Sequence, residues 1–494
     1  MSEAESRLGG LTFGTSGLRA PLGEGPGRMN RQVVAHTAAG LAAWLAPRAD
    51  APTVVVGHDA RHESDVFAHE CAQVLAGAGV RTLLLDGPVP TPVLAFAVGH
   101  LGASAGVMIT ASHNPATDNG LKVYLDDTTQ VAAPDDEAIS ARIAATPPFT
   151  DLPRSSAWEE VGAAVVSAYV DAVAGPQRAA SQELVVAYTP LHGVGADVFL
   201  AAAARHGHTD IRIVAEQAVP DPAFPTVAYP NPEEPGTLDR VLALARQVQA
   251  DVVIAHDPDA DRCAVAVSDG GQLTVLTGDE LGILLADHLL RHGFTGTYAS
   301  SVVSSSFMGA LAAAHGQPWQ QTLTGFKWLG KVPDLAFAYE EALGYCVAPG
   351  VVRDKDGISA ALAVLDLVSE LRASGKTLLD RLGELFATHG ERRTRSVSLR
   401  LASHGHVLAA MRRLRADPPA LLGEERIASV DDFSPGFGDL PPADLLRLNL
   451  QDARVIIRPS GTEPMMKAYV EARDRSACEA LATDVRELLE ALAS

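Results

Sequence analysis

The sequence reads Ile109-Thr110-Ala111-Ser112-His113-Asn114-Pro115 at the point that decides the fold, and it continues as Ala116-Thr117-Asp118-Asn119-Gly120-Leu121-Lys122. The apolar run 105–109 before it predicts a buried strand, and the Asn-Pro and Asn-Gly pairs favour turns. Ser112 is therefore expected on a loop at the end of a strand, beside a histidine. Because loops held by a rigid scaffold often carry function, this serine is a candidate nucleophile or phosphate carrier.

The composition is that of an acidic globular protein. Its 494 residues are 47% hydrophobic and 20% charged, and 39 Lys and Arg against 60 Asp and Glu give a net charge of −21. A chain of this length is expected to form about two to four domains. The net charge argues against general binding of nucleic acid or of anionic membranes, and an anionic substrate would need a local basic pocket.

The cysteines and the apolar runs indicate a cytoplasmic protein. Cys71, Cys263, Cys346 and Cys478 form no Cys-x-x-Cys pair, which favours buried thiols in a reducing cytosol over a zinc site or disulfides. The segment 1–5 lacks the basic and apolar regions of a signal peptide. No apolar run approaches the ~20 residues of a membrane helix, so no membrane association is expected.

Strands and helices are predicted to alternate along most of the chain. Apolar runs predict strands at 53–56, 82–85, 105–109, 184–188, 211–214, 252–255 and 298–303, and Ala- and Leu-rich segments predict helices at 64–78, 92–100, 195–206, 237–249, 281–292 and from 306. Such βαβ units indicate parallel or mixed sheets with helices on their faces. The last third differs, because strands at 393–400, 454–457 and 467–471 and a helix at 476–493 predict a smaller α+β unit.

Turn-rich segments suggest the domain boundaries. The prolines between 147 and 153 mark a linker, and Ser268-Asp269-Gly270-Gly271 is a turn that can also close a hairpin. We expect four domains, at residues 1–160, 161–270, 271–380 and 381–494.

Three aspartates directly follow the predicted strand 252–255. Asp257, Asp259 and Asp261 in Asp-Pro-Asp-Ala-Asp-Arg lie at a strand's carboxyl end, where open α/β sheets place ligands. Carboxylates at i, i+2 and i+4 can converge on one hard cation such as Mg²⁺. A solvated acidic turn is the alternative, but the preceding buried strand favours a metal site. An EF-hand is disfavoured because the later positions lack the required Gly and Glu.

Two glycine-containing loops can bind phosphate. Arg458-Pro459-Ser460-Gly461-Thr462-Glu463-Pro464 follows the predicted strand 454–457. Arg458 can hold a phosphate with two donors, and Ser460, Thr462 and the amides around Gly461 can form an anion nest. The N-terminal loop Phe13-Gly14-Thr15-Ser16-Gly17-Leu18-Arg19 is the second, although plain turns explain both loops when each is taken alone.

Charged residues gather in one further region of the sequence. It contains Gly325-Phe326-Lys327-Trp328, Glu340-Glu341-Ala342-Leu343-Gly344-Tyr345 and Arg353-Asp354-Lys355-Asp356-Gly357. Carboxylates here could accept hydrogen bonds from sugar hydroxyls, and ordinary surface charge explains them equally well. His192 is expected to be structural, and His58 and Asp59 lie at a strand end but match no motif.

Taken in order, these motifs resemble those of the α-D-phosphohexomutase superfamily. Its pattern is a phosphoserine loop Thr-Ala-Ser-His-Asn-Pro, a metal loop Asp-x-Asp-x-Asp-Arg, a sugar loop and a C-terminal loop Arg-x-Ser-x-Thr. All four are found here, the sugar loop in altered form, and the resemblance covers essentially the whole chain. The segments 325–328, 339–342 and 354–357 are most similar to the branch of phosphopentomutases and glucose-1,6-bisphosphate synthases.

The resemblance implies a fold, ligands and partners. Three tandem α/β domains with mixed sheets and a smaller C-terminal α+β domain, similar to the TATA-binding protein, would surround a central cleft. Mg²⁺ would be the metal, and glucose 1,6-bisphosphate or a related sugar 1,6-bisphosphate the activator. Sugar phosphates would be the only partners of a monomer or homodimer.

The resemblance also implies roles for individual residues. Ser112 would carry a phosphoryl group and bind the metal through it, together with Asp257, Asp259 and Asp261. His113 or Lys122 is the candidate general base, and Arg19, Lys122 and Arg262 would neutralise developing charge. The substrate-binding residues would be Lys327, Glu341, Gly344, Arg458, Ser460, Gly461 and Thr462.

The sugar loop departs from the family pattern. The usual Glu-x-Ser-Gly-His corresponds to Glu341-Ala342-Leu343-Gly344-Tyr345, so Leu343 replaces a hydroxyl and Tyr345 a cationic candidate. Because missing polar partners decide discrimination between similar sugars, glucose, mannose and pentose phosphates all remain open.

The first hypothesis is therefore a mutase that moves a phosphoryl group between the 1- and 6-positions of glucose phosphate, and also of mannose phosphate. A phosphopentomutase and a glucose-1,6-bisphosphate synthase are the alternatives within the same fold. A phosphosugar-binding regulator without catalysis is the third, and the intact serine, aspartates and phosphate loop oppose it.

Overall fold

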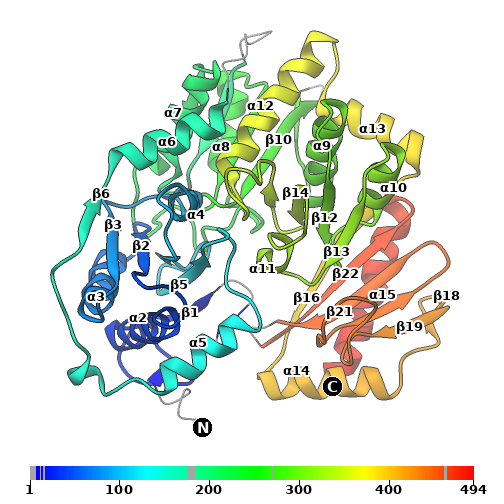
Figure 1. The fold of residues 1–494 in the computed structure, drawn as a ribbon. Helices are drawn as coiled ribbons and strands as arrows, with labels where there is room; N and C mark the ends of the chain where they lie inside the picture. Colours follow the sequence, from blue (N-terminus) through cyan, green and yellow to red (C-terminus); the bar gives the residue numbers. More distant parts are fainter. Residues whose placement is uncertain are drawn as a thin grey trace.

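The computed structural model describes residues 7–11, 13–14, 17–175, 184–269, 271–460 and 464–493. Four main sheets follow one another along the chain, and they form an arc from the blue N-terminal unit to the red C-terminal unit (Figure 1). The first three sheets mix parallel and antiparallel pairs, whereas the fourth is antiparallel. This architecture confirms the expected three α/β units followed by a smaller α+β unit.

The first sheet has six strands in the order β1-β5-β4-β2-β3-β6. Val54 and Val56 pack into one apolar cluster and Val55 into another, because the sheet is covered on both faces. Burial on both faces explains the continuous apolar run at these positions. The elements are β1 (Leu18–Pro21), α2 (Arg31–Leu45), β2 (Thr53–His58), α3 (Ser64–Gly77), β3 (Arg81–Leu85), α4 (Thr91–His100), β4 (Ala105–Ile109), β5 (Asp118–Leu125), α5 (Asp135–Ala144), the 3₁₀ turn Phe149–Asp151 and β6 (Glu159–Val161).

The second sheet has five strands in the order β11-β10-β9-β7-β8. Asp269 pairs with Gln272, so β10 and β11 form a hairpin. The elements are α6 (Ala163–Ala174), β7 (Val186–Thr189), α7 (Gly195–His206), β8 (Ile211–Ile213), the 3₁₀ turn Ala215–Gln217, α8 (Asp239–Val248), β9 (Val252–His256), β10 (Cys263–Asp269) and β11 (Gln272–Val275).

The third sheet has four strands in the order β13-β12-β14-β15. Its long helix α12 contacts α7 and α9, so it lies in the apolar core that the second and third units share. The elements are α9 (Gly278–Arg291), β12 (Thr297–Ser301), α10 (Phe307–Ala314), β13 (Trp319–Thr322), α11 (Phe326–Leu329), β14 (Leu335–Glu340), β15 (Gly344–Cys346), α12 (Gly357–Ala373) and α13 (Leu378–His389).

The fourth sheet has five strands in the order β16-β22-β21-β20-β19. One face packs on α14 and α15, and Ile456 on the other face packs with Val302 and Val303 of the third unit. Along the described part of the chain, no helix is long and apolar enough to cross a bilayer. The elements are β16 (Arg393–Arg400), α14 (His404–Ala416), β17 (Leu421–Leu422), β18 (Glu425–Arg426), β19 (Ser429–Asp432), β20 (Leu446–Asn449), β21 (Arg454–Pro459), β22 (Met465–Ala472) and α15 (Arg475–Ala493).

Two elements differ from the sequence-based expectation. The Asn119-Gly120 pair predicts a turn, but both residues lie in β5, which pairs with β1 and β4. Tertiary pairing on both edges therefore overrides the local turn preference. Helix α9 begins before Leu281, because Thr277 and Glu280 form a capping box at its N-terminus.

Asp279, near the start of α9, joins the third unit to the fourth. Its carboxylate accepts hydrogen bonds from Ser305 N (2.6 Å), Tyr339 OH (2.9 Å) and Thr394 Oγ1 of β16 (2.6 Å). Burial raises the pKa of Asp279 to about 7, whereas an exposed aspartate has a pKa of about 3.9. Between these two values the folded state binds more protons than the unfolded state, so this carboxyl group destabilises the fold as pH rises towards 7.

We expect Asp279→Asn to be more stable than the parent at about pH 8, by on the order of 2 kcal/mol. The reason is that asparagine keeps an acceptor oxygen without a buried charge, and the advantage should shrink as pH falls towards 4. Urea unfolding at several pH values measures this difference. The control is Asp380→Asn, because Thr377 N donates to the exposed Asp380 and lowers its pKa; this change should destabilise the protein at neutral pH. A parent more stable than Asp279→Asn at pH 8 would contradict the prediction.

Candidate active site

Ser112 lies in the turn after β4, as the sequence predicts. Its φ of 51° is left-handed, and its backbone N–H donates to Thr110 Oγ1 at 2.8 Å. The hydroxyl donates to Asp257 Oδ2 at 2.8 Å and lies 3.3 Å from His113 Nδ1. The first sheet thus places this serine directly against the aspartate loop of the second sheet.

The three aspartates converge as their spacing predicts. One carboxylate oxygen from each of Asp257, Asp259 and Asp261 lies within 4.8 Å of the others, and all three residues are buried. Lys122 Nζ donates to Asp259 Oδ2 at 2.7 Å and to Asp261 Oδ2 at 2.6 Å. Asp259 Oδ1 and Asp261 Oδ1 are buried and have no hydrogen-bond partner among the described residues. Since Mg²⁺ prefers oxygen ligands, this donor set fits the expected cation.

Neighbouring turns hold the aspartate loop in place. Thr91 N donates to Asp259 O at 2.9 Å, and Thr91 Oγ1 donates to Asp259 Oδ2 at 2.6 Å. Val194 N donates to Pro258 O at 2.8 Å, and a Cβ at Gly193 would clash with the backbone of Pro258. The turn that contains Gly193 therefore needs a glycine to approach this closely, and it braces the loop.

Burial and charge divide the three carboxyl groups into two kinds. Burial, with repulsion from Asp259 and Asp261, raises the pKa of Asp257 well above its usual range. Burial also opposes ionisation of Asp259 and Asp261, but Lys122, joined by Thr91 at Asp259 and by Lys355 and Arg262 at Asp261, lowers the pKa of both. Lys122, the cation shared by both carboxylates, therefore helps to keep Asp259 and Asp261 ionised.

The site is locally basic in a strongly acidic protein. Lys355 Nζ lies 3.4 Å from Asp261 Oδ2, and Arg262 Nε lies 3.9 Å from Asp257 Oδ2. Arg19 interacts electrostatically with Asp259 and Asp261. The cations gathered around the three aspartates are Arg19, Arg61, Lys122, Arg262 and Lys355.

His113 lies beside Ser112 and its imidazole is held in the neutral form. Desolvation by the surrounding protein atoms, together with the positive charges of Arg262 and Arg19, lowers the pKa of His113 well below its usual range. The ring is therefore neutral at pH 7, and its Nδ1 faces the hydroxyl of Ser112.

Arg61 is a site residue that the motifs do not predict. Its guanidinium donates to four backbone carbonyls of the serine loop: Ser112 O, Asn114 O (2.6 Å), Pro115 O (2.8 Å) and Asp118 O (3.2 Å). The sequence gives only a slight indication of this role: the loop after β2 is expected at the same sheet edge as the loop after β4. Arg61 thus shapes the loop that presents the serine.

Asp59 stabilises the position of Arg61 and of the serine loop. Its carboxylate accepts hydrogen bonds from Thr110 Oγ1 and Ser64 Oγ, both at 2.6 Å. Arg61 Nε lies 3.3 Å from Asp59 Oδ2. Asp59 therefore orients both Arg61 and the threonine that receives the Ser112 amide.

We expect Arg61→Lys to lower kcat by roughly 10- to 100-fold. A lysine ammonium cannot donate to the four carbonyls that the planar guanidinium holds, so the serine loop is expected to shift. The Mg²⁺ concentration for half-maximal activity should stay near that of the parent, since no aspartate of the metal loop is changed. Steady-state kinetics at varied Mg²⁺ measure both quantities. Arg48→Lys is the control, because Arg48 is exposed and its guanidinium donates to Trp44 O and lies over the Trp44 ring, far from the serine loop in the sequence. A parental kcat for Arg61→Lys would contradict the prediction.

The altered sugar loop is largely buried. Tyr345 is fully buried and its hydroxyl donates to Gly278 O at 3.3 Å, so it does not replace a cationic ligand. A Cβ at Gly344 would clash with Lys355, so the glycine lets that lysine cross the loop. Glu341 Oε2 accepts hydrogen bonds from Ser301 Oγ and Ser304 Oγ, both at 3.0 Å.

The C-terminal phosphate loop is only partly described. Arg458 Nη2 donates to Tyr469 OH at 2.9 Å, and Arg458 Nε is buried with no partner among the described residues. Arg458 also interacts electrostatically with Glu341, which places the fourth sheet beside the sugar loop. Ser460 N donates to Met465 O at 2.8 Å, whereas Gly461 and Thr462 lie outside the described residues.

Lys327 of the third unit contacts the first unit, and Arg19 of β1 contacts the serine loop. Lys327 Nζ lies 3.6 Å from Asp136 Oδ2 and 3.5 Å from Gly14 O. Arg19 Nη1 donates to Asn114 Oδ1 of the serine loop at 3.2 Å. Of the N-terminal loop, residues 15 and 16 lie outside the described part of the chain.

Comparison with family models decides the family. The models of phosphoglucomutase/phosphomannomutase alpha/beta/alpha domains I, II and III match residues 10–148, 167–271 and 277–389, and the C-terminal domain model matches residues 400–488. The chain belongs to the phosphoglucomutase/phosphomannomutase family. It is therefore a sugar phosphate mutase of the phosphohexomutase type, an intramolecular phosphotransferase.

Named relatives of this mutase differ in their sugars. It is 42% identical to the "Probable phosphomannomutase" of Haemophilus influenzae, over 90% of this chain and 93% of that protein. It is 35% identical to the "Probable phosphoribomutase" of Schizosaccharomyces pombe (97% and 90% covered) and 32% identical to the phosphoglucomutase of Staphylococcus aureus (96% and 92% covered). A solved structure of a phosphomannomutase-like protein from Thermus thermophilus superposes with a TM-score of 0.79 at 26% identity, covering 97% of this chain and 99% of that chain.

Proposed function

We propose that this mutase moves a phosphoryl group between the 1- and 6-positions of a hexose phosphate, glucose and also mannose, through a phosphorylated Ser112 and a sugar 1,6-bisphosphate. One observation carries the proposal. The Ser112 hydroxyl, on the first sheet, donates to Asp257, one of three converging aspartates on the second sheet. A serine in such a cluster of carboxylates and cations suits phosphoryl transfer, which depends on positioning and charge stabilisation.

Cationic residues at the site can offset part of the negative charge of a phosphoserine. A phosphoryl group on Ser112 brings about −1.5 to −2 charge beside three carboxylates. Lys122 and Arg262 offset part of this charge, because both lie against those carboxylates. Mg²⁺, held by Asp257, Asp259, Asp261 and a phosphate oxygen, would neutralise the rest and polarise the transferring phosphoryl group.

The transfer needs one proton acceptor and one proton donor. A sugar hydroxyl oxygen forms the new bond to phosphorus and its proton passes to a base. The bond from phosphorus to Ser112 Oγ breaks, and the base returns that proton to Oγ. His113 is the better candidate base, because its ring is neutral and lies 3.3 Å from Ser112 Oγ. Lys122 already donates to Asp259 and Asp261, which supports a role in holding charge instead.

The other end of the substrate is assigned to the third and fourth units. Arg458, with a buried unpartnered Nε among the described residues, and Ser460 would bind the phosphate that does not react, together with Gly461 and Thr462. Glu341 would accept hydrogen bonds from sugar hydroxyls. After the first transfer the bisphosphate must turn over and return its other phosphate to Ser112, and motion of the fourth unit would exclude water.

A phosphopentomutase or a glucose-1,6-bisphosphate synthase is the second candidate. Leu343 and Tyr345 are buried, so the sugar loop does not offer the polar pair of the usual hexose loop. The similarity of the segments 325–328, 339–342 and 354–357 to that branch supports this candidate, as does the relative named a phosphoribomutase.

A substrate panel tests these candidates. The phosphates glucose 1-phosphate, mannose 1-phosphate and ribose 1-phosphate are each assayed with glucose 1,6-bisphosphate as activator. We expect kcat/KM to be highest for glucose 1-phosphate and measurable for mannose 1-phosphate. A higher value for ribose 1-phosphate would establish the pentomutase, and net accumulation of bisphosphate from 1,3-bisphosphoglycerate would establish the synthase. If a protein shown to be folded has no activity with any of the three sugar phosphates, all three candidate functions would be contradicted.

We also propose that the enzyme acts in the cytoplasm. All four cysteines are free and buried. Unpaired buried thiols suit a reducing compartment.

A further inference from the structure

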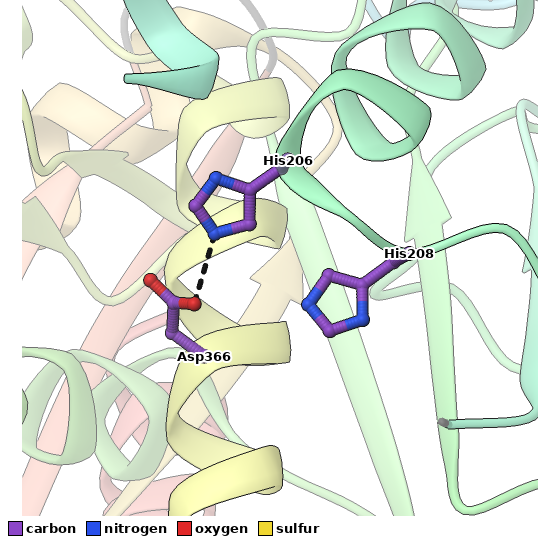
Figure 2. A group of neighbouring side chains, drawn as sticks. All are labelled: His206, His208 and Asp366. Carbon is purple, nitrogen blue, oxygen red and sulfur yellow. Dashed lines mark hydrogen bonds and ion pairs between the residues drawn. The ribbon is translucent and has the colours of Figure 1, made fainter. Parts of the chain in front are cut away.

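A second group of potential metal ligands lies where the second unit meets α12. His206 ends α7, His208 follows in the turn before β8, and Asp366 faces both from α12 (Figure 2). One ligand atom from each of the three lies within 4.8 Å of the others, and both histidines are buried. These residues lie outside the four motifs quoted above and play no part in the proposed mechanism.

The hydrogen bonds of His206 require a cation beside Asp366. Its Nδ1 lies 2.7 Å from Ala174 O and its Nε2 lies 2.8 Å from Asp366 Oδ1. Both partners are acceptors, so either a proton or a metal ion must lie between Nε2 and the carboxylate. The Ala174 carbonyl selects the tautomer with the proton on Nδ1, which leaves the Nε2 lone pair for a metal.

His208 completes the group with a second imidazole. Its ring stacks beside that of His206, with centroids 5.8 Å apart and planes at 26°, and one ring nitrogen points towards Asp366 (Figure 2). Burial, followed by the effect of His206, lowers the pKa of His208. The ring is therefore neutral at pH 7, as a metal ligand must be.

We propose that His206, His208 and Asp366 bind a divalent transition-metal ion such as Zn²⁺, at a site separate from the three aspartates of the active site. Two imidazoles and a carboxylate are ligands that Zn²⁺ prefers, with bonds of about 2.0–2.2 Å and a fourth position for water. The separation of Nε2 and Oδ1 would open from 2.8 Å to about 3.3 Å for tetrahedral bonds of this length. The ion replaces the proton between them, and that proton is released to solvent.

A neighbouring group of potential ligands on the same helix includes a contact with an arginine. His288, His292 and Glu370 also place ligand atoms within 4.8 Å of one another, and Glu370 lies one turn after Asp366 on α12. However, the Arg291 guanidinium donates to Glu370, so its positive charge repels a metal ion there. This group serves as an internal control.

Metal binding would act on a helix that reaches the active site. Asp356 caps the N-terminus of α12, and Gly357 N donates to Ala260 O of the aspartate loop at 3.2 Å. Along a helix, Asp366 lies about 15 Å from this end. An ion that joins α7 to α12 would therefore tie the second unit to the helix that supports the aspartate loop, and it would raise Tm.

The experiment titrates the metal-stripped full chain with Zn²⁺ by calorimetry and with Co²⁺ by visible absorption, in excess Mg²⁺ to fill the active site. His208→Asn is the first variant, because no hydrogen bond of the His208 side chain is observed among the described residues. Asp366→Asn is the second, because it keeps the shape and removes the charge. His292→Asn is the matched control.

We expect the parent and His292→Asn each to bind one Zn²⁺ with similar affinity. His208→Asn and Asp366→Asn should bind it at least about tenfold more weakly. Zn²⁺ should raise Tm in the first pair more than in the second, and circular dichroism without metal verifies that each variant is folded. Parental Zn²⁺ affinity in folded His208→Asn would overturn the proposal. So would loss of the ion in His292→Asn, or a parent whose Co²⁺ spectrum shows no imidazole coordination.

Discussion

Ser112→Ala is expected to lower kcat by at least about a thousandfold, because removal of a covalent nucleophile costs more than loss of any supporting contact. The hydroxyl that this change removes donates to Asp257 and faces His113. Interconversion of glucose 1-phosphate and glucose 6-phosphate with added bisphosphate measures kcat. Mass spectrometry should find a phosphoserine in the parent that is missing from the variant.

Ser112→Gly separates the chemical loss from backbone strain. The φ of 51° at Ser112 is unfavourable for alanine and readily adopted by glycine. We expect both variants to be equally inactive, since both lack the hydroxyl. Near-parental interconversion by either variant would rule out Ser112 as the phosphate carrier, and restored activity in the glycine variant alone would assign the alanine defect to strain.

Asp259→Asn is expected to lower kcat by at least about a hundredfold and to raise the Mg²⁺ concentration for half-maximal activity at least about tenfold. Loss of a supporting residue alone costs about 10- to 100-fold in metal affinity, and this change removes a ligand charge. The amide also loses the ion pair with Lys122, whose Nζ lies 2.7 Å from Asp259 Oδ2. Initial rates over a Mg²⁺ series measure both effects.

Asp126→Asn is the control for this change, because it removes the same charge from an exposed residue at the end of β5. It should leave kcat and the Mg²⁺ dependence near those of the parent. Urea unfolding must show that Asp259→Asn remains folded. A folded Asp259→Asn protein with a parental Mg²⁺ dependence would mean that the three aspartates do not bind the metal.

The parts of the site that lie at strand ends could be predicted from the sequence. Ser112 and Asp257 each follow an apolar run that forms a buried strand, and the i, i+2, i+4 spacing carries the convergence of the three aspartates within one loop. These are local relations, so periodicity and turn chemistry suffice to find them. The roles assigned to these residues in catalysis stay predictions until the variants are measured.

Arg61 was not predicted, and Lys355 was quoted within the segment 353–357 but given no role of its own. Both omissions have a physical reason. An arginine after a strand and a lysine before a helix carry no local signal, because charged residues at such places are usually solvated. Arg61 becomes a site residue only because β2 and β4 are parallel neighbours, which brings the two loops that follow them together. Lys355 becomes one because Gly344 leaves room for its side chain to reach Asp261.

The order of strands and helices, and the serine and aspartate loops at strand ends, follow from patterns only a few residues long, and therefore the chain's α/β class and its phosphoryl chemistry can be recognised without coordinates. Contacts between distant segments decide the rest. Pairing of β5 with β1 and β4 places Lys122 between two aspartates. Packing of the Tyr345 side chain into the interior, where its hydroxyl donates to Gly278 O, makes it unavailable to a sugar. Packing of α7 on α12 brings two histidines to Asp366. Such contacts depend on how whole sheets and helices pack, and no local pattern encodes that packing.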